Sequence, residues 1–116
     1  MNMNLKTILD LLDCEVIVGE NQLDIEFRHC FCADLMSDVL AYAKENSILL
    51  TSLTSAQSIR TADVADIVAV VYLRGKTPVD AAISFAEINK IPLLTTKYGA
   101  FTACGILYEK GIRNNT

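Results

Sequence analysis

The sequence lacks the features that mark several large classes of protein. No apolar run reaches the roughly 18 residues that a membrane-spanning helix needs. Lysine and arginine number 10 against 14 acidic residues, and the net charge of −4 argues against a nucleic-acid partner, because phosphate contacts need clustered basic side chains. The N-terminus is amphipathic and acidic, unlike a signal peptide. We therefore expect a cytoplasmic protein that binds neither membranes nor nucleic acid.

A disulfide-rich spacing of cysteines is missing too. The chain has four cysteines, Cys14, Cys30, Cys32 and Cys104. Small domains that depend on disulfides are extracellular and carry a denser cysteine framework than this one. We therefore expect reduced thiols.

The densest set of soft metal ligands is His29-Cys30-Phe31-Cys32. On a strand, Cys30 and Cys32 would face one side and His29 the other, which is poor geometry for a single metal ion. Cys14 could add a thiolate only if its strand lies beside this one. The spacing matches no zinc or iron–sulfur pattern. We interpret these cysteines as structural and expect no cofactor, with an iron–sulfur cluster on His29, Cys30 and Cys32 as the alternative.

The clearest structural signal is the stretch from Asp66 to Thr96, which predicts a strand, a helix and a second strand. Residues 67–73 form an unbroken, β-branched apolar run, which predicts a strand covered on both faces and favours a parallel sheet. Residues 91–95 return as the second strand, because Pro92 is tolerated where a strand begins.

Between these two strands, the residues of a helix N-terminus are in place. Thr77 is a good N-cap, Pro78 suits the first helical position and Asp80 puts negative charge in the first turn. We predict a helix that starts within a residue or two of Thr77 and ends near Asn89-Lys90.

The rest of the chain alternates between helix and strand patterns. We predict helices over 4–12, 34–44, 55–64 and 98–110, and strands over 14–18, 25–31 and 48–51. Gly111 suits the left-handed position after the last helix, and Gly105 within it predicts close approach to another element. Alternating strands and helices describe a three-layer α/β fold with a mostly parallel sheet. The composition, 52% hydrophobic and 21% charged, is that of one domain, 1–116.

The helix over 78–89 is apolar on more than one side. Its core stripe would be Val79, Ala82, Ile83 and Ala86, but Ala81, Phe85 and Ile88 continue the apolar surface to the opposite side. A helix of this kind in a short chain predicts a second surface, most simply in a homodimer. The alternative is that the N-terminal helix or a loop covers Phe85 and Ile88.

Three phrases carry a resemblance to a known family: DIVAVVYLRGKTP, AEINKIPLLTTKYGAF and CGILYEKGI. With the order of the elements, they make the chain similar to the DRTGG domain family over about residues 15–112. The family is named for an Asp-Arg-Thr-Gly-Gly run, and the nearest stretch here, 59–63, keeps only Arg60 and Thr61 of it.

This resemblance implies an α/β, non-catalytic and often dimeric module. Such domains occur between nucleotide-sensing CBS repeats in some pyrophosphatases, in some phosphate acetyltransferases, and as short stand-alone proteins. The stand-alone members are associated with iron hydrogenase genes, which implies a hydrogenase or another enzyme as a partner.

Polar and basic residues follow the predicted strands where ligands bind in open parallel sheets, outside the strands' carboxyl ends. Several precede helix N-termini, which favour anions. These patterns predict a site for a nucleotide or another phosphate-bearing ligand, although hydroxyls at such places are also ordinary helix caps and the cations could be solvated. The residues we select for this site are Thr54, Arg60, Arg74, Lys76, Thr95 and Lys97.

Catalytic signals are weak. His29 is the single histidine, and no serine or cysteine stands in a nucleophile motif. Asp63 and Asp66 flank the start of the central strand, at the end opposite the expected ligand site. We therefore favour a regulatory or protein-interaction module without catalysis. A hydrogenase-associated iron–sulfur protein and a phosphate sensor are the other two readings.

Overall fold

The computed structural model describes residues 3–114 and consists of short strands and helices in alternation. The helices are α1 (Leu5–Leu11), α2 (Met36–Tyr42), α3 (Ala56–Val64), α4 (Asp80–Asn89) and α5 (Ala100–Glu109), with one 3₁₀ turn, η1 (Glu20–Gln22). The strands are β1 (Met3–Asn4), β2 (Glu15–Val18), β3 (Glu26–Phe27), β4 (His29–Cys32), β5 (Ser47–Thr51), β6 (Ala69–Tyr72) and β7 (Leu93–Thr95).

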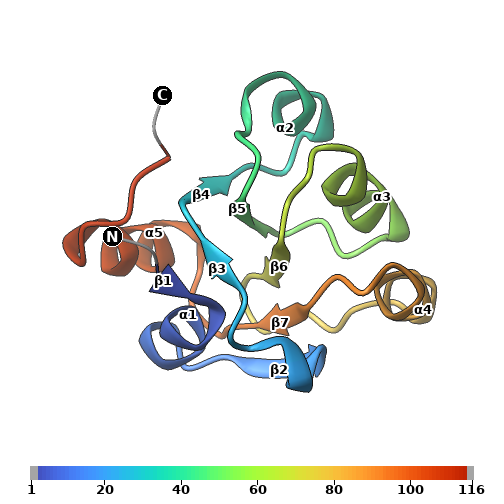
Figure 1. Ribbon diagram of the computed structural model, residues 1–116, viewed down its shortest axis with the longest axis horizontal. Coiled ribbons are helices and arrows are strands. Elements are labelled where there is room, and N and C mark those ends of the chain that lie inside the picture. The colour runs from blue at the N-terminus through green and yellow to red at the C-terminus, as the bar shows by residue number, and fades with distance from the viewer. Residues whose placement is uncertain (1–2, 115–116) are drawn as a thin grey trace.

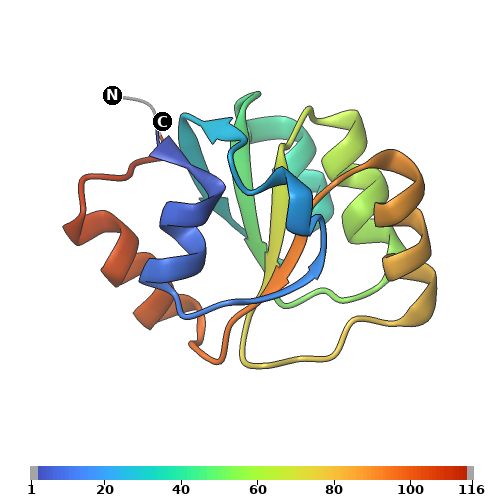
Figure 2. The same ribbon diagram turned by 60° about the horizontal axis from the view of Figure 1, so that its bottom comes forward.

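These elements form three layers, as Figures 1 and 2 show. A five-stranded sheet in the order β2-β7-β6-β5-β4 lies in the middle. The helices α1 and α5 cover one face, and α2, α3 and α4 cover the other. Only β2 runs antiparallel to its neighbour, and the pairs β4-β5, β5-β6 and β6-β7 are parallel. The predicted three-layer α/β fold with a mostly parallel sheet is confirmed.

The two central strands explain the apolar runs in the sequence. Every residue of β5 and β6 is buried. Ile48 and Leu50 pack with α1 and α5, whereas Leu49 between them packs with α2, α3 and α4. Successive side chains of a strand point to opposite faces, so a strand covered on both sides needs apolar residues at every position. None of the described helices is both long and apolar enough to cross a membrane.

The prediction of one strand over 25–31 is wrong. This segment forms two strands, β3 and β4, that belong to different sheets. β3 pairs with β1 in a separate antiparallel ladder, and β4 pairs with β5 at the edge of the main sheet. Between them, the backbone N–H of Arg28 donates to the carbonyl of Asn46 (2.8 Å), which turns the chain from one sheet toward the other.

The helix α4 starts later than predicted. Its N-cap is Val79, two residues later than Thr77, and Val79 remains 46% exposed instead of joining the core stripe. After β6 the chain makes a turn in which the N–H of Lys76 donates to Leu73, and Pro78 is buried before the helix begins. The predicted end is confirmed, because Lys90 takes the left-handed conformation with φ of 55°.

The close approach predicted at Gly105 is not found. A Cβ at this position would meet no atom within 4 Å among the described residues, so the glycine faces open space. The close approach occurs instead at Gly19, where a Cβ would lie 2.9 Å from Cβ of Pro92. Gly19 also has a positive φ of 96°, which favours glycine. Gly111 takes the predicted left-handed conformation, with φ of 91°.

One buried pair of hydroxyls joins the sheet to α3. The side-chain oxygens of Tyr72 and Ser58 lie 2.7 Å apart, and both residues are buried. The Ser58 hydroxyl also lies 2.8 Å from the carbonyl oxygen of Ser55 and donates to it. A serine hydroxyl has one hydrogen, so Tyr72 is the donor to Ser58. Burial raises the pKa of Tyr72.

We predict that Ser58→Ala destabilises the protein more than Tyr72→Phe does. The serine substitution leaves a buried tyrosine hydroxyl without a partner, which costs about 1–3 kcal/mol, whereas Tyr72→Phe removes one bond worth about 1 kcal/mol and leaves Ser58 paired with Ser55. Urea unfolding at pH 7 of both variants and of the double variant measures this. The double variant should lose less than the sum of the single losses. A larger loss for Tyr72→Phe would contradict the donor assignment.

Candidate functional site

The carboxyl ends of the central strands meet at one edge of the sheet. Thr51, Tyr72 and Thr95 end β5, β6 and β7, and they stand side by side in register. The loops after β6 and β7 are joined by backbone hydrogen bonds from Arg74 N–H to Tyr98 O (2.9 Å) and from Gly75 N–H to Thr96 O (2.7 Å). This edge is where ligands bind in open parallel sheets.

Three of the predicted basic residues come together at these loops. Arg74 lies against the start of α5, since a Cβ on Gly99 would be 3.0 Å from the Arg74 guanidinium carbon. Lys97 lies beside the neighbouring loop, with its Cγ 3.9 Å from where a Cβ on Gly75 would be. The loop after β6 turns through two left-handed residues, because φ is 61° at Arg74 and 63° at Gly75. The three cations Arg74, Lys76 and Lys97 are all exposed.

The loop after β5 joins the same region through Lys76 and Asp34. The Lys76 ammonium donates to the carbonyl of Ser52 (3.3 Å). One carboxylate oxygen of Asp34 accepts from the Thr51 hydroxyl (3.1 Å) and from the backbone N–H of Ser52 (2.6 Å). Asp34 therefore holds the end of β5. It does not start the helix predicted over 34–44, because α2 begins at Met36.

The other predicted ligand residues take different positions. Thr54 is half-buried in the loop before α3, and Thr95 is half-buried at the end of β7. Arg60 is not grouped with the other cations. Its guanidinium carbon lies 5.5 Å from the centre of the Phe85 ring, a cation–π contact between α3 and α4. The stretch 59–63 that resembles the family's namesake run lies within α3.

Sequence reasoning missed the part that Thr96 plays. Its side chain is buried, and its hydroxyl donates to the carbonyl of Leu12 (2.6 Å), 84 residues earlier in the chain. The same oxygen accepts from the backbone N–H of Tyr98 (3.3 Å). Thr96 thus ties the end of α1 to the loop that carries Lys97. No local pattern could have predicted this contact, because it depends on the packing of α1 across the sheet.

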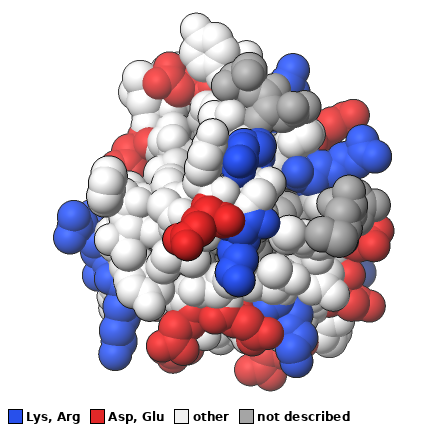
Figure 3. Space-filling view, turned by 90° about the vertical axis from the view of Figure 1, so that its left-hand side faces the viewer, with Lys and Arg blue, Asp and Glu red and all other residues white. Residues whose placement is uncertain are grey.

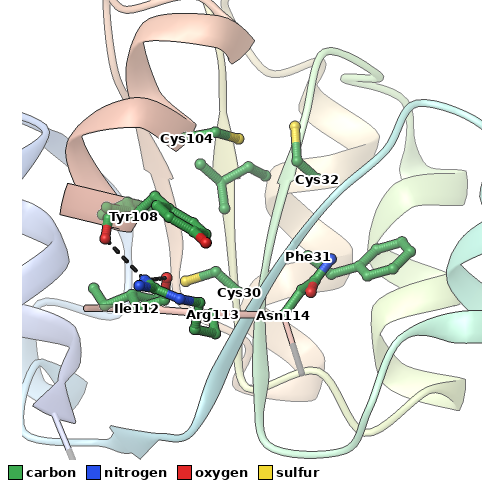
Figure 4. Close-up of a pocket in the computed structure, with 10 residues that line it drawn as sticks. Cys30, Phe31, Cys32, Cys104, Tyr108, Ile112, Arg113 and Asn114 are labelled. Atoms are coloured by element: carbon green, nitrogen blue, oxygen red, sulfur yellow. Dashed lines mark hydrogen bonds between the residues drawn. The ribbon is translucent and has the colours of Figure 1, made fainter. Parts of the chain in front are cut away.

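A cavity of about 220 Å³ lies between β4 and α5 (Figure 4). Its remaining wall is the segment after α5, which pairs with the edge strand through a hydrogen bond from Cys30 N–H to the carbonyl of Arg113 (3.1 Å). The Arg113 guanidinium stacks on the Tyr108 ring at 3.6 Å and donates to the Tyr108 carbonyl (2.8 Å). The residues lining the cavity are Cys30, Phe31, Cys32, Leu50, Cys104, Leu107, Tyr108, Ile112, Arg113 and Asn114.

Three of the four cysteines line this cavity, and all four are free thiols. Cys32 and Cys104 point toward each other from β4 and α5 (Figure 4). A hydrogen bond from the Cys32 thiol lowers the pKa of Cys104 to about 7, and donation of that hydrogen raises the pKa of Cys32. Burial raises the pKa of Cys30 to about 12.

The metal site considered for His29, Cys30 and Cys32 does not form among residues 3–114. Among residues 3–114, no group of three or more histidine, cysteine or acidic residues could hold a metal ion. Cys14 precedes β2, at the sheet edge opposite β4, so it cannot supply the missing thiolate. The residue that does approach Cys32 is Cys104, which only the packing of α5 against the edge strand could reveal.

The acidic residues that were weighed for catalysis lie at the other end of the sheet. Asp63 and Asp66 are exposed and line a shallow cleft with Asn46 and Lys90. This cleft is beside the start of β6, as expected. It is separated from the basic residues at the carboxyl edge by the length of the strand.

The two predicted interface residues differ in exposure. Ile88 is 76% exposed near the end of α4. Phe85 is half-buried, and the residue that contacts its ring is Arg60 of α3 rather than one of the N-terminal helix. Because α1 packs on the opposite face of the sheet, the alternative that it covers Phe85 and Ile88 is wrong.

We predict that Cys104 is the most reactive thiol at neutral pH. The thiolate is the nucleophile, so the lowered pKa of Cys104 should make its alkylation by iodoacetamide half-maximal near pH 7. The groups that face it are Cys32, Cys30 and, through Cys32, Asp34. Peptide mass spectrometry of alkylation across pH 5–10 measures the profile. Cys32→Ser removes the thiol donor and should change the profile, whereas a midpoint at or above pH 8.5 in the unmodified chain would contradict the assignment.

Comparison with known proteins agrees with this architecture. The crystal structure of the CBS and DRTGG domains of the regulatory region of Clostridium perfringens pyrophosphatase, complexed with the activator diadenosine tetraphosphate, matches with a TM-score of 0.73 and 22% sequence identity. The match covers 90% of this chain and 45% of that one, so this chain spans less than half its length. Among curated proteins, no sequence match is found. The DRTGG domain model matches residues 7–109, and the chain belongs to the DRTGG domain family.

Proposed function

We propose that this protein is a regulatory domain that senses a phosphate-bearing ligand at the carboxyl edge of its sheet. The observation that carries the proposal is the meeting of Arg74, Lys76 and Lys97 at loops joined to one another by backbone hydrogen bonds. Exposed cations on adjacent loops suit a ligand with several negative charges. The protein itself has a net charge of −4, so a local basic group is not a consequence of overall composition.

The start of α5 adds backbone donors to this group of cations. Gly99 is the N-cap, and no side chain caps this end of the helix. The first N–H groups of a helix have no partner within it, and they favour an anion. The Arg74 guanidinium lies against Gly99, so a phosphate held there would meet both kinds of donor. Arg60 is not part of this proposed site, because it stacks on Phe85.

The comparison with the pyrophosphatase supports this choice of ligand class. That regulatory region is complexed with an activator that contains phosphate, diadenosine tetraphosphate. Part of that region, 45% of its chain, shares its fold with this chain. We propose an adenine nucleotide or another polyphosphate as the ligand class, without catalysis.

We expect diadenosine tetraphosphate, ATP or pyrophosphate to raise the thermal unfolding midpoint. A ligand at about 100 times its dissociation constant stabilises the folded state by about 2.7 kcal/mol, which moves the midpoint of a domain this size by on the order of 10 °C. Differential scanning fluorimetry with each compound, in the absence of divalent metals and again in their presence, measures the shift. No shift with any of these phosphates at millimolar concentration would contradict the proposal.

Substitution of the loop cations then locates the site. Arg74→Ala and Lys97→Ala should each weaken binding about tenfold or more, since a charge-assisted hydrogen bond is worth about 1.5–3 kcal/mol. Lys44→Ala is the matched control, because Lys44 is an exposed cation just before β5 starts, at the opposite end of the sheet. Isothermal titration calorimetry compares the three variants. Equal weakening by Lys44→Ala would point to nonspecific charge attraction and place the ligand elsewhere.

We also propose that the protein is a homodimer, with Phe85 and Ile88 of α4 in the interface. The exposed side chain of Ile88 supports this surface. A second exposed surface lies on α5, where Phe101 is 93% exposed beside Gly105. Figure 3 shows the side of the molecule that bears α5, where uncharged residues form much of the surface and both charge signs are interspersed.

Light scattering of Ile88→Glu and Phe101→Glu distinguishes these two surfaces. We expect the unmodified chain to be dimeric and Ile88→Glu to be monomeric, because a carboxylate buried without a partner disrupts an apolar contact. Dissociation by Phe101→Glu alone would assign the contact to α5 and refute the α4 interface. A monomeric unmodified chain would refute the dimer.

The location and protein partners of the domain are predictions of the same proposal. We expect a cytoplasmic protein whose ligand state controls a partner enzyme, and a hydrogenase is the partner that the family resemblance suggests. The iron–sulfur alternative would need ligands from more than one chain, because residues 3–114 do not assemble three ligands. Metal analysis after anaerobic purification tests it, and substoichiometric iron would exclude it.

A further inference from the structure

Cys32 and Cys104 face each other on the cavity between β4 and α5 (Figure 4). Cys32 ends the edge strand β4, and Cys104 lies in the second turn of α5. The two are 72 positions apart in the sequence, and only the packing of α5 beside β4 brings them together. Both line the same cavity, and each thiol influences the pKa of the other.

This pair differs from the two other cysteines in the exposure of Cys32 and the pKa of Cys104. Cys32 is exposed, whereas Cys14, Cys30 and Cys104 are half-buried, and Cys104 is the one whose pKa is lowered. Cys30 lies deeper in the same cavity, and desolvation raises its pKa to about 12. Cys14 is also desolvated, and its thiol lies 3.9 Å from the Ile8 carbonyl in the core around α1. A small oxidant in solution can therefore reach Cys32 most easily, and the thiolate that forms most readily is that of Cys104, which faces it.

We propose that Cys32 and Cys104 are a redox modification site, a dithiol that peroxides and low-molecular-weight disulfides convert to an intramolecular disulfide. With a peroxide, the Cys104 thiolate attacks one oxygen, the O–O bond breaks, and a sulfenic acid forms with release of water or an alcohol. The Cys32 thiol then attacks the Cys104 sulfur, the S–O bond breaks, and water leaves. The net reaction oxidises two thiols to one disulfide and reduces one peroxide.

A disulfide partner leads to the same product by exchange. The Cys104 thiolate attacks one sulfur of the low-molecular-weight disulfide, and a thiolate leaves from it. Cys32 then resolves the mixed disulfide and releases the second thiol. Cys104 is the attacking group in both routes because its pKa is lowered by Cys32, so it forms the thiolate more readily. The thiolate is the nucleophilic form of cysteine.

The bond would fasten an edge strand to a helix on one face of the sheet. β4 has one neighbour in the sheet, β5, and on its other side the N–H of Cys30 donates to the carbonyl of Arg113. A covalent link to α5 would join two of the elements that line the 220 Å³ cavity. Cys32 also lies two residues before Asp34, whose carboxylate holds Thr51 and Ser52. Oxidation would therefore act next to the loops of the proposed phosphate site, although the inference does not depend on that site.

Oxidation of the purified, fully reduced chain with hydrogen peroxide or oxidised glutathione tests the proposal. We expect intact mass spectrometry to show the loss of two hydrogen atoms per chain, and peptide mapping without reductant to join Cys32 to Cys104. Closing a loop of about 70 residues should raise the thermal unfolding midpoint by on the order of 10–20 °C on the chain-entropy model. Dithiothreitol should reverse both changes.

Two serine variants make the result specific. Cys32→Ser should abolish the bridge, and the substituted residue is exposed, so folding is not at risk. Cys30→Ser is the matched control within the same cavity and should leave the bridge intact. A bridge that involves Cys30, a disulfide between two chains, or sulfinic acid at Cys104 as the main product would overturn the proposal. So would a pair that stays fully reduced under an excess of both oxidants.

Discussion

The structure depends on the burial of β5 and β6 on both faces. Every residue of these two strands is buried, so helices have to cover the sheet on each side. The chain meets this requirement with α2, α3 and α4 on one face and with its two ends, α1 and α5, on the other. Packing the N-terminal helix beside the C-terminal one brings together segments that no local pattern connects.

The parallel arrangement of β5, β6 and β7 determines which loops meet at the carboxyl edge of the sheet. Parallel strands end at the same edge, so the loops after β5, β6 and β7 converge there, and backbone hydrogen bonds join two of them directly. Thr96 joins these loops to the end of α1, because its hydroxyl donates to the Leu12 carbonyl. Asp34 holds the end of β5, because its carboxylate accepts from the N–H of Ser52. Few of these contacts involve the basic side chains themselves. Arg74, Lys76 and Lys97 are therefore presented by a backbone framework that would keep its shape if one cation were replaced.

The sequence predicted that these three cations lie together, because their proximity follows from the parallel sheet. Residues at the ends of apolar runs must lie near one another once the runs form a parallel sheet, and three of the four selected cations do so. Arg60 did not, because it lies in the second turn of α3, where the side chain turns to Phe85 of α4. The division of residues 25–31 between two sheets was also missed, since a hydrogen bond from Arg28 to the distant Asn46 lies at the break. The start of α4 was missed because a turn after β6 precedes it.

The sequence by itself determined the α/β class, the central strands and the presence of helices between them. It could do so because hydrophobic periodicity and helix caps act within a few residues along the chain. Only the tertiary structure decided which groups meet. The edge positions of β2 and β4 separated Cys14 from Cys30 and Cys32, and the packing of α5 put Cys104 opposite Cys32. The physical reason is that strand order and helix placement depend on burial of the whole sheet, a property that no single segment encodes.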